Sequence, residues 1–149
     1  MSLTNTAESD LLALIFQNTN MGLVGDATGL RGSSTAGSLY ISLHSSDPGE
    51  GGSQTTNEIS YTGYARVGVA RNGSQWTVSG TAPTQVQNTN VILFGECTVG
   101  SATAAYFGVG TDSSGAGKLL ISGQLTAPLA ISVGITPQFA ANQLTVTAD

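Results

Sequence analysis

The segment that decides the fold runs from Leu39 to Arg71 and reads LYISLHSSDPGEGGSQTTNEISYTGYARVGVAR. Apolar residues alternate with small or polar residues at both of its ends, and this period of two predicts two half-buried β-strands. The alternating apolar positions are Leu39, Ile41 and Leu43 at the first end and Ala65, Val67 and Val69 at the second. Asp47-Pro48-Gly49 predicts a turn, because Pro presets φ and Gly supplies a positive φ. The loop from His44 to Gly63 is long for a hairpin connection, which favours a role in contact or function.

One helix is predicted before this segment, over residues 5–18. Asn5 is its expected N-cap, with Glu8 three residues later in capping-box spacing. An apolar stripe follows, made of Leu11, Leu12, Ile15 and Phe16. A helix of about four turns is marginal alone. We therefore expect the stripe to pack on the chain's own sheet or, as the alternative, on another subunit.

Short apolar or alternating runs continue to the end of the chain, at 75–78, 91–94, 103–110, 118–125, 129–135 and 143–147. Asn72-Gly73 predicts a two-residue hairpin, residues 80–90 look like a polar loop, and 91–94 looks like a strand buried on both sides. Trp76 is expected to anchor the core, or alternatively an interface. About eight strands and one helix predict an all-β fold: a single β-sandwich or jelly-roll-like domain over 1–149, with its sandwich at 39–147.

Charged residues are scarce in this chain. Asp, Glu, Lys and Arg make up 9% of it, against about 25% in an average soluble protein. The polar surface must therefore consist mainly of Ser, Thr, Asn, Gln and Gly, which cost far less to desolvate than charges. This composition favours a surface that neighbouring molecules cover, and the alternative is an ordinary Gly- and Thr-rich β protein.

The net charge of −5 and the four cations argue against binding to nucleic acid or to an anionic membrane. The apolar run 11–16 is too short to span a membrane. The N-terminus does not resemble a secretory signal, so we expect synthesis in a cytoplasm. Cys97 is the single cysteine, which excludes an internal disulfide, and we expect it to be a small buried residue.

The residues give little support for catalysis, a cofactor or a metal. His44 is the only histidine and is expected at the surface, where strand one leaves the sheet. No nucleophile motif accompanies it, so we expect no enzymatic activity. The loop acids Asp47, Glu50 and Glu58 could hold calcium, but their spacing matches no calcium loop. We expect them to form a solvated rim.

Several segments together resemble a widespread bacteriophage virion family, whose members are tail-fibre-like proteins or capsid decoration (cement) proteins. They are 39–43, 46–50, 61–67, 107–110, 115–120 and 135–141. The set covers most of the chain, although residues 76–100 are less typical. The resemblance implies a structural role on a virion.

Within that resemblance, capsid cement is our first expectation: a protein on the outer surface of the capsid that binds the major capsid protein and stabilises the head shell. The alternative is a tail or tail-fibre module, with binding of host-surface carbohydrate as a further option. The resemblance also implies a homo-oligomer, with a trimer as first choice. The residues expected to contact a partner are Leu11, Leu12, Ile15 and Phe16 on the helix and Tyr61 and Tyr64 at the end of the long loop.

Overall fold

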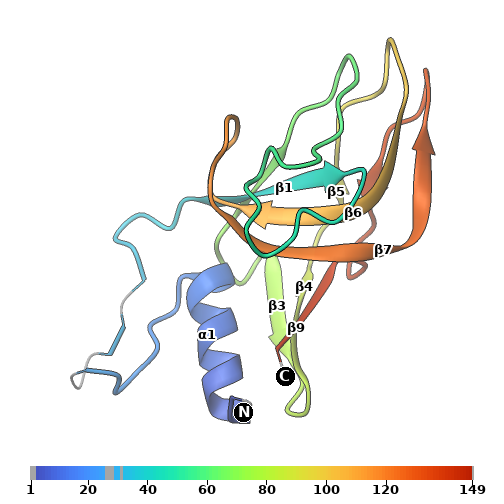
Figure 1. Ribbon diagram of the computed structural model, residues 1–149. Helices are drawn as coiled ribbons and strands as arrows, with labels where there is room; N and C mark the ends of the chain where they lie inside the picture. Colours follow the sequence, from blue (N-terminus) through green and yellow to red (C-terminus); the bar gives the residue numbers. More distant parts are fainter. Residues whose placement is uncertain (1–2, 26–28, 31, 149) are drawn as a thin grey trace. The chain divides into compact units, whose positions relative to one another are not determined.

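The computed structural model describes residues 3–25, 29–30 and 32–148, and these residues form one α-helix and nine β-strands (Figure 1). The all-β prediction with one short N-terminal helix is therefore confirmed. The chain groups into two compact units. The first comprises 1–37, 70–92 and 139–149, and the second comprises 38–69 and 93–138. The single-domain arrangement over 1–149 stays a prediction.

The first unit consists of one helix and a three-stranded antiparallel sheet. The sheet has the order β3-β4-β9, and α1 contacts all three strands. Its elements are α1 (Asn5–Gln17), β3 (Trp76–Ser79), β4 (Thr84–Asn88) and β9 (Thr145–Ala148). The helix thus packs on the chain's own sheet. Its N-cap is Thr4, whose side chain accepts from the Ala7 amide, so the predicted cap at Asn5 is wrong by one residue.

The core of the first unit is centred on Phe16 and Trp76. Both side chains are fully buried, and their rings meet edge to face with centroids 4.9 Å apart. Leu12, Val86 and Leu144 are buried in the same unit. The core role predicted for Trp76 is confirmed.

Strand β4 lies where the sequence predicted a polar loop, so that prediction is wrong. Two polar residues of β4, Thr84 and Asn88, are buried, and Asn88 is buried because its side chain satisfies backbone groups. The Asn88 side chain donates to the carbonyls of Asn90 and Ala140 and accepts from the Leu144 amide, at 2.7–2.8 Å. A polar side chain with this role looks like a loop residue in the sequence.

The predicted hairpin at Asn72-Gly73 is also wrong. The strands before and after it, β2 (Val67–Ala70) and β3, belong to different sheets. The Asn72 side chain instead accepts from the amides of Ser74 and Gln75 and stabilises a local turn.

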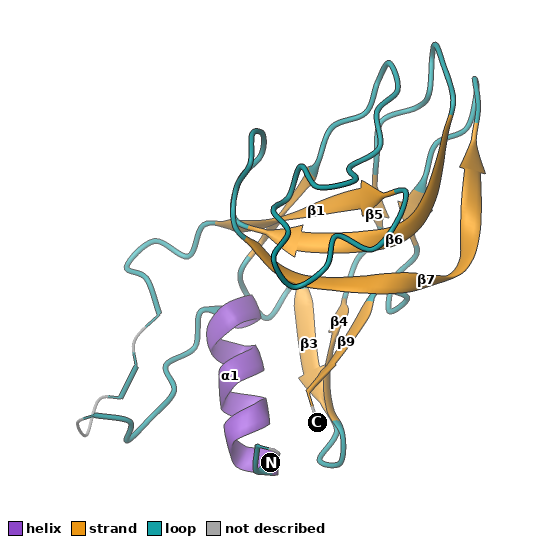
Figure 2. Cartoon of the chain, viewed as in Figure 1, coloured by secondary structure: helices purple, strands orange, loops and turns teal. Residues whose placement is uncertain are grey.

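The second unit contains a four-stranded sheet of order β2-β1-β6-β7 and long loops (Figure 2). Strand β1 pairs with β6, and β6 with β7, both antiparallel. The other strands of this sheet are β1 (Ser38–His44), β6 (Ala102–Gly110) and β7 (Leu119–Ile131). Leu39, Ile41 and Leu43 are buried, as the alternation predicts. Two further strands of two residues each, β5 (Ile92–Leu93) and β8 (Gln138–Phe139), form a separate two-stranded sheet.

Two strand predictions fail in the second half of the chain. The strands expected on either side of Pro128 are one strand, β7, since an edge strand tolerates a residue without an N–H. The run at 91–94 is not buried on both sides, because Val91 and Leu93 are more than half exposed while Ile92 and Phe94 are buried.

The Phe16–Trp76 contact predicts that Phe16→Ala destabilises the protein by about 3–5 kcal/mol, because it removes a fully buried ring. Urea unfolding followed by the fluorescence of Trp76 measures this. Leu11→Ala, on the partly exposed part of α1, is the matched control and is expected to cost much less. Equal losses for the two variants would contradict this view of the core.

Candidate functional site

The long loop between β1 and β2 is held by a buried ion pair. The Arg66 guanidinium donates from Nε to Glu58 Oε1 and from Nη2 to Glu58 Oε2, both at 2.7 Å. The Arg66 side chain is 3% exposed and that of Glu58 is 15% exposed. Two parallel charge-assisted bonds fix orientation as well as distance. Glu58 is therefore not part of a solvated rim, and that prediction is wrong for this residue.

Arg66 also holds the loop that joins β6 to β7. Its Nη1 donates to the Asp112 carbonyl at 2.9 Å, and its Nη2 donates to the Gly115 carbonyl at 2.8 Å. The fully buried Gln54 side chain reinforces this contact, since it accepts from the Asp112 amide and donates to the Asp112 carbonyl. The pKa of Arg66 is raised, chiefly by its hydrogen bonds to Glu58.

Tyr64 completes this set of bonds, which we call the Arg66 network and define as Gln54, Glu58, Tyr64 and Arg66 with their partners. The Tyr64 hydroxyl accepts from the Leu43 amide at 3.0 Å and donates to Glu58 Oε1 at 2.9 Å. Burial raises the pKa of Tyr64, so the hydroxyl keeps its proton and its donor role. The network therefore joins β1, the long loop and the β6–β7 loop.

His44 is completely buried, so its predicted place at the surface is wrong. Its Nδ1 lies 2.8 Å from the Thr56 carbonyl, which can only accept, so Nδ1 carries the hydrogen. Its Nε2 then accepts from the Ser42 hydroxyl, also at 2.8 Å. Burial lowers the pKa of His44 and favours this neutral, doubly bonded ring.

Ser42 and His44 have the hydrogen bond of a nucleophile and its general base. Both side chains are fully buried, however. Gly108 covers them so closely that a Cβ there would lie 2.6 Å from both Ser42 Oγ and His44 Nε2. A substrate has no access to Ser42 in this arrangement, and the pair supplies hydrogen bonds inside the sheet.

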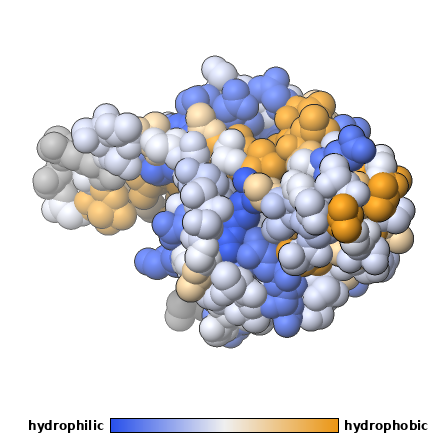
Figure 3. All heavy atoms as spheres, turned by 90° about the horizontal axis from the view of Figure 1, so that it is seen from above, coloured by the Kyte–Doolittle hydropathy of each residue, from blue (hydrophilic) through white to orange (hydrophobic). Residues whose placement is uncertain are grey.

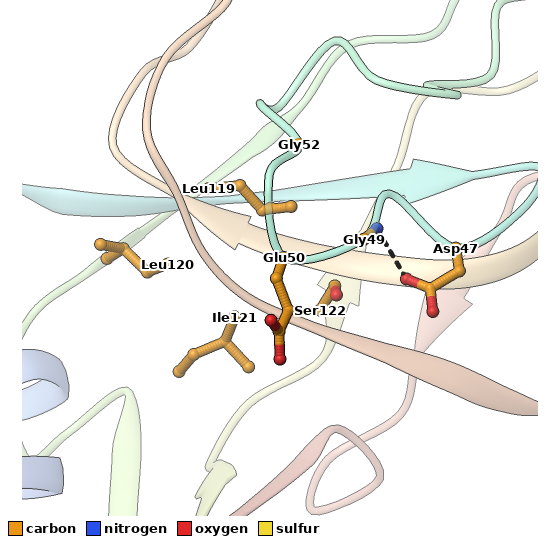
Figure 4. Close-up of a pocket in the computed structure, with 8 residues that line it drawn as sticks. All are labelled: Asp47, Gly49, Glu50, Gly52, Leu119, Leu120, Ile121 and Ser122. Atoms are coloured by element: carbon orange, nitrogen blue, oxygen red, sulfur yellow. Dashed lines mark hydrogen bonds between the residues drawn. The ribbon is translucent and has the colours of Figure 1, made fainter.

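An open groove of about 360 Å³ lies between the start of the long loop and β7 (Figure 4). Its lining residues are Asp47, Gly49, Glu50 and Gly52 from the loop and Leu119, Leu120, Ile121 and Ser122 from β7. The predicted turn is confirmed, since Gly49 has φ 70° and its amide donates to Asp47 Oδ1 at 2.9 Å. We call this feature the β7 groove.

Two predicted partner-contact residues lie close together in the second unit. Tyr61 is buried and donates to the Gly95 carbonyl, while Tyr64 is partly buried and stacks on Phe94. The two tyrosines meet edge to face at 5.4 Å. Neither ring stands free as an aromatic platform for a sugar. A partner contact through them stays a prediction.

The predicted contact residues on the helix divide into two pairs. Leu12 and Phe16 are buried in the first unit, whereas Leu11 and Ile15 are partly exposed. Contact between this stripe and a partner stays a prediction. Of the four residues, only Leu11 and Ile15 are exposed enough to make such a contact.

Both carboxylate oxygens of Glu58 accept hydrogen bonds from Arg66. Of the three acids considered as calcium ligands, only Asp47 and Glu50 therefore remain. In the described part of the chain, no group of three or more His, Cys, Asp or Glu side chains is placed to hold a metal. Cys97 is buried, as predicted. No helix among the described residues is long and apolar enough to cross a membrane.

Sequence reasoning missed the β7 wall of the groove and the role of Arg66. A signal for Arg66 was present, because it is a lone cation within the apolar alternation of Ala65 and Val67. The groove wall had no local signal, since it depends on which strand the long loop lies against.

Comparison with known proteins identifies the class of this chain. The family model described as Podophage GP4 fiber I protein gp80 matches residues 2–147, which is nearly the whole chain. The protein is therefore a structural protein of a bacteriophage virion, as its sequence segments suggested. It belongs to this podophage fibre family. A search of curated proteins gave no match.

The buried ion pair predicts that Glu58→Gln lowers the free energy of unfolding by about 3 kcal/mol, because Arg66 remains buried without a counter-charge. Chemical denaturation measures this loss. Glu96→Gln removes the same charge from an exposed position and is expected to change stability by less than about 0.5 kcal/mol. A loss for Glu58→Gln no larger than that of the control would contradict the role of the pair.

The depressed pKa of His44 predicts that stability falls as the pH drops below 6.5, the ordinary histidine value. Below this pH the histidine of the unfolded chain binds a proton, whereas His44 in the folded chain stays neutral. The free energy of unfolding therefore falls by up to about 1.4 kcal/mol per pH unit. The stability contribution is complete above pH 6.5. Glu58 raises the pKa of His44 and Arg66 lowers it, but desolvation is the largest effect.

NMR titration measures this pKa directly, since His44 gives the only imidazole signal. Unfolding between pH 7.5 and 5.5 measures the slope, and His44→Gln should flatten it. A folded-state pKa at or above 6.5 would contradict the buried neutral ring.

Proposed function

We propose that this chain is a component of a phage tail fibre, which corresponds to the alternative reading of the sequence and not to capsid cement. The observation that carries the proposal is the match of residues 2–147 to a family described as a fibre protein. The match includes residues 76–100, the region where the sequence resemblance was weakest. Capsid decoration, with the major capsid protein as partner, is the competing assignment.

The surface supports a role among closely packed neighbours. Figure 3 shows a face on which several hydrophobic residues are exposed, next to residues of intermediate and hydrophilic character. The second unit contributes the exposed side chains Leu93, Val99, Leu120, Leu129, Val133 and Ile135. Apolar groups and neutral hydrogen-bonding groups lose little when a neighbour covers them. A fibre subunit, which is surrounded by other subunits, gains from such a surface.

The proposal extends to assembly. Copies of the chain associate with one another, and a trimer is the first arrangement to test, because closed symmetry is usual for assemblies of one chain. The partly exposed Leu11 and Ile15 are available for such a contact. Neither nucleic acid nor membrane is proposed as a partner.

Labelling of intact particles tests this function. Gold-conjugated antibody against the chain should bind along or at the base of the fibres, and particles assembled without the chain should lack fibres while their heads keep their heat resistance. Antibody against the major capsid protein is the control for head labelling. Label over the head, together with heads that burst at lower temperature when the chain is missing, would support capsid decoration instead.

A further inference from the structure

Strand β7 has a free edge and little cover. It lies at the end of the sheet order, so it pairs with β6 on one side only. Ile131 is the only buried residue among its thirteen. On the free side, every second residue directs its N–H and C=O away from the sheet. These groups can pair with a further strand.

Proteins usually protect such an edge with charges, prolines, short strands or a covering segment. Strand β7 contains no charged residue from Leu119 to Ile131, and its one proline, Pro128, lies near its far end. Residues 119–127 therefore keep all their N–H groups. This length exceeds the usual strand of about five to six residues.

The β7 groove lies beside the first part of this edge. Figure 4 shows the Glu50 side chain directed toward the part of β7 that contains Ile121 and Ser122. Asp47 uses Oδ1 to accept from the Gly49 amide, and Glu50 has no hydrogen-bond partner among the described residues. Two carboxylates thus line a groove whose other wall is a strand with one unpaired edge. A cation is the group that these carboxylates would favour.

We propose that the β7 groove binds an extended polypeptide segment of a partner protein. The segment adds a strand to the free edge at Leu119–Ser122 and places a lysine or arginine beside Asp47 and Glu50. Main-chain hydrogen bonds to the edge supply affinity, and the two carboxylates supply selectivity for a cationic segment. This inference goes beyond the fibre assignment, because it concerns what the chain holds and not where it lies in the particle.

The charges favour a different protein over a second copy as the occupant. Arg66 is paired with Glu58, and Arg71 donates to the carbonyls of Leu14, Ile15 and Ala36. Lys118 is the one exposed cation left in the described part of the chain, and it immediately precedes β7 itself. Among the described residues, the one free cation of a second copy therefore lies beside β7, the strand whose own edge would have to pair.

The probe is a synthetic peptide, acetyl-Thr-Val-Thr-Lys-Thr-Val-Thr-amide, titrated into the full chain and followed by NMR amide shifts. Two matched peptides accompany it: one with glutamate in place of the lysine, and one with alternate backbone nitrogens methylated. The expected shifts map to Leu119–Ser122 and to the loop residues 47–52. The lysine peptide should bind about fivefold more tightly than the glutamate peptide. Methylation should abolish binding.

Variants of the chain separate the edge from the charges. Leu120→Lys places a charge on the free edge and should abolish binding, while Val133→Lys, at an exposed position outside the groove, should not. Glu50→Gln should weaken binding of the lysine peptide severalfold. Binding of the glutamate peptide should be unchanged or slightly tighter. Glu96→Gln, an exposed carboxylate away from the groove, is the charge control. Each variant's fold is checked by its amide spectrum.

Three results would overturn the proposal. The first is equal binding of the lysine and glutamate peptides, or undiminished binding of the methylated one. The second is a set of shifts that maps away from β7. The third is self-association that Leu120→Lys abolishes while the lysine peptide fails to compete, which would assign the edge to a second copy. The experiment uses the isolated chain, so its result is independent of whether the chain lies on the fibre or on the head.

Discussion

The second unit depends on the ion pair between Arg66 and Glu58. A buried ion pair contributes little net stability compared with apolar residues of the same shape, but removing one partner leaves a costly unpaired charge. Such a pair therefore specifies geometry more than it adds stability. Here the guanidinium makes four hydrogen bonds, two to Glu58 and one each to the carbonyls of Asp112 and Gly115. Moving the long loop would separate Glu58 from Arg66 and leave a buried charge unpaired. The ion pair therefore fixes the position of the loop.

The same constraint shapes the surface of the unit. The Arg66 network places the long loop, and the first part of that loop forms one wall of the β7 groove. The other wall is an uncharged strand with an unpaired edge. The β7 groove therefore has a fixed position beside an unpaired sheet edge. Few charged residues occur elsewhere in the chain. This combination suits a structural protein that makes contacts by burial and backbone pairing.

Local patterns in the sequence were enough for much of the fold. The period-two alternation located β1, the apolar stripe located α1, and the size of Trp76 indicated its place in the core. The failures share a different cause. Asn88, His44 and Glu58 are polar residues that look exposed in the sequence, yet each is paired with groups distant in the chain or across a loop. Pairing across the fold has no local signature, so the β7 groove could not be predicted either.

Hydrogen–deuterium exchange of Arg66→Lys tests the central claim most directly, because lysine keeps the charge but cannot make the four bonds of the guanidinium. The account predicts that amides in 52–58 and 111–118 lose protection together, while amides of β3, β4 and β9 in the first unit keep theirs. Unchanged protection in 111–118, with loss confined to 52–58, would show that Arg66 does not join the two loops and would contradict the account.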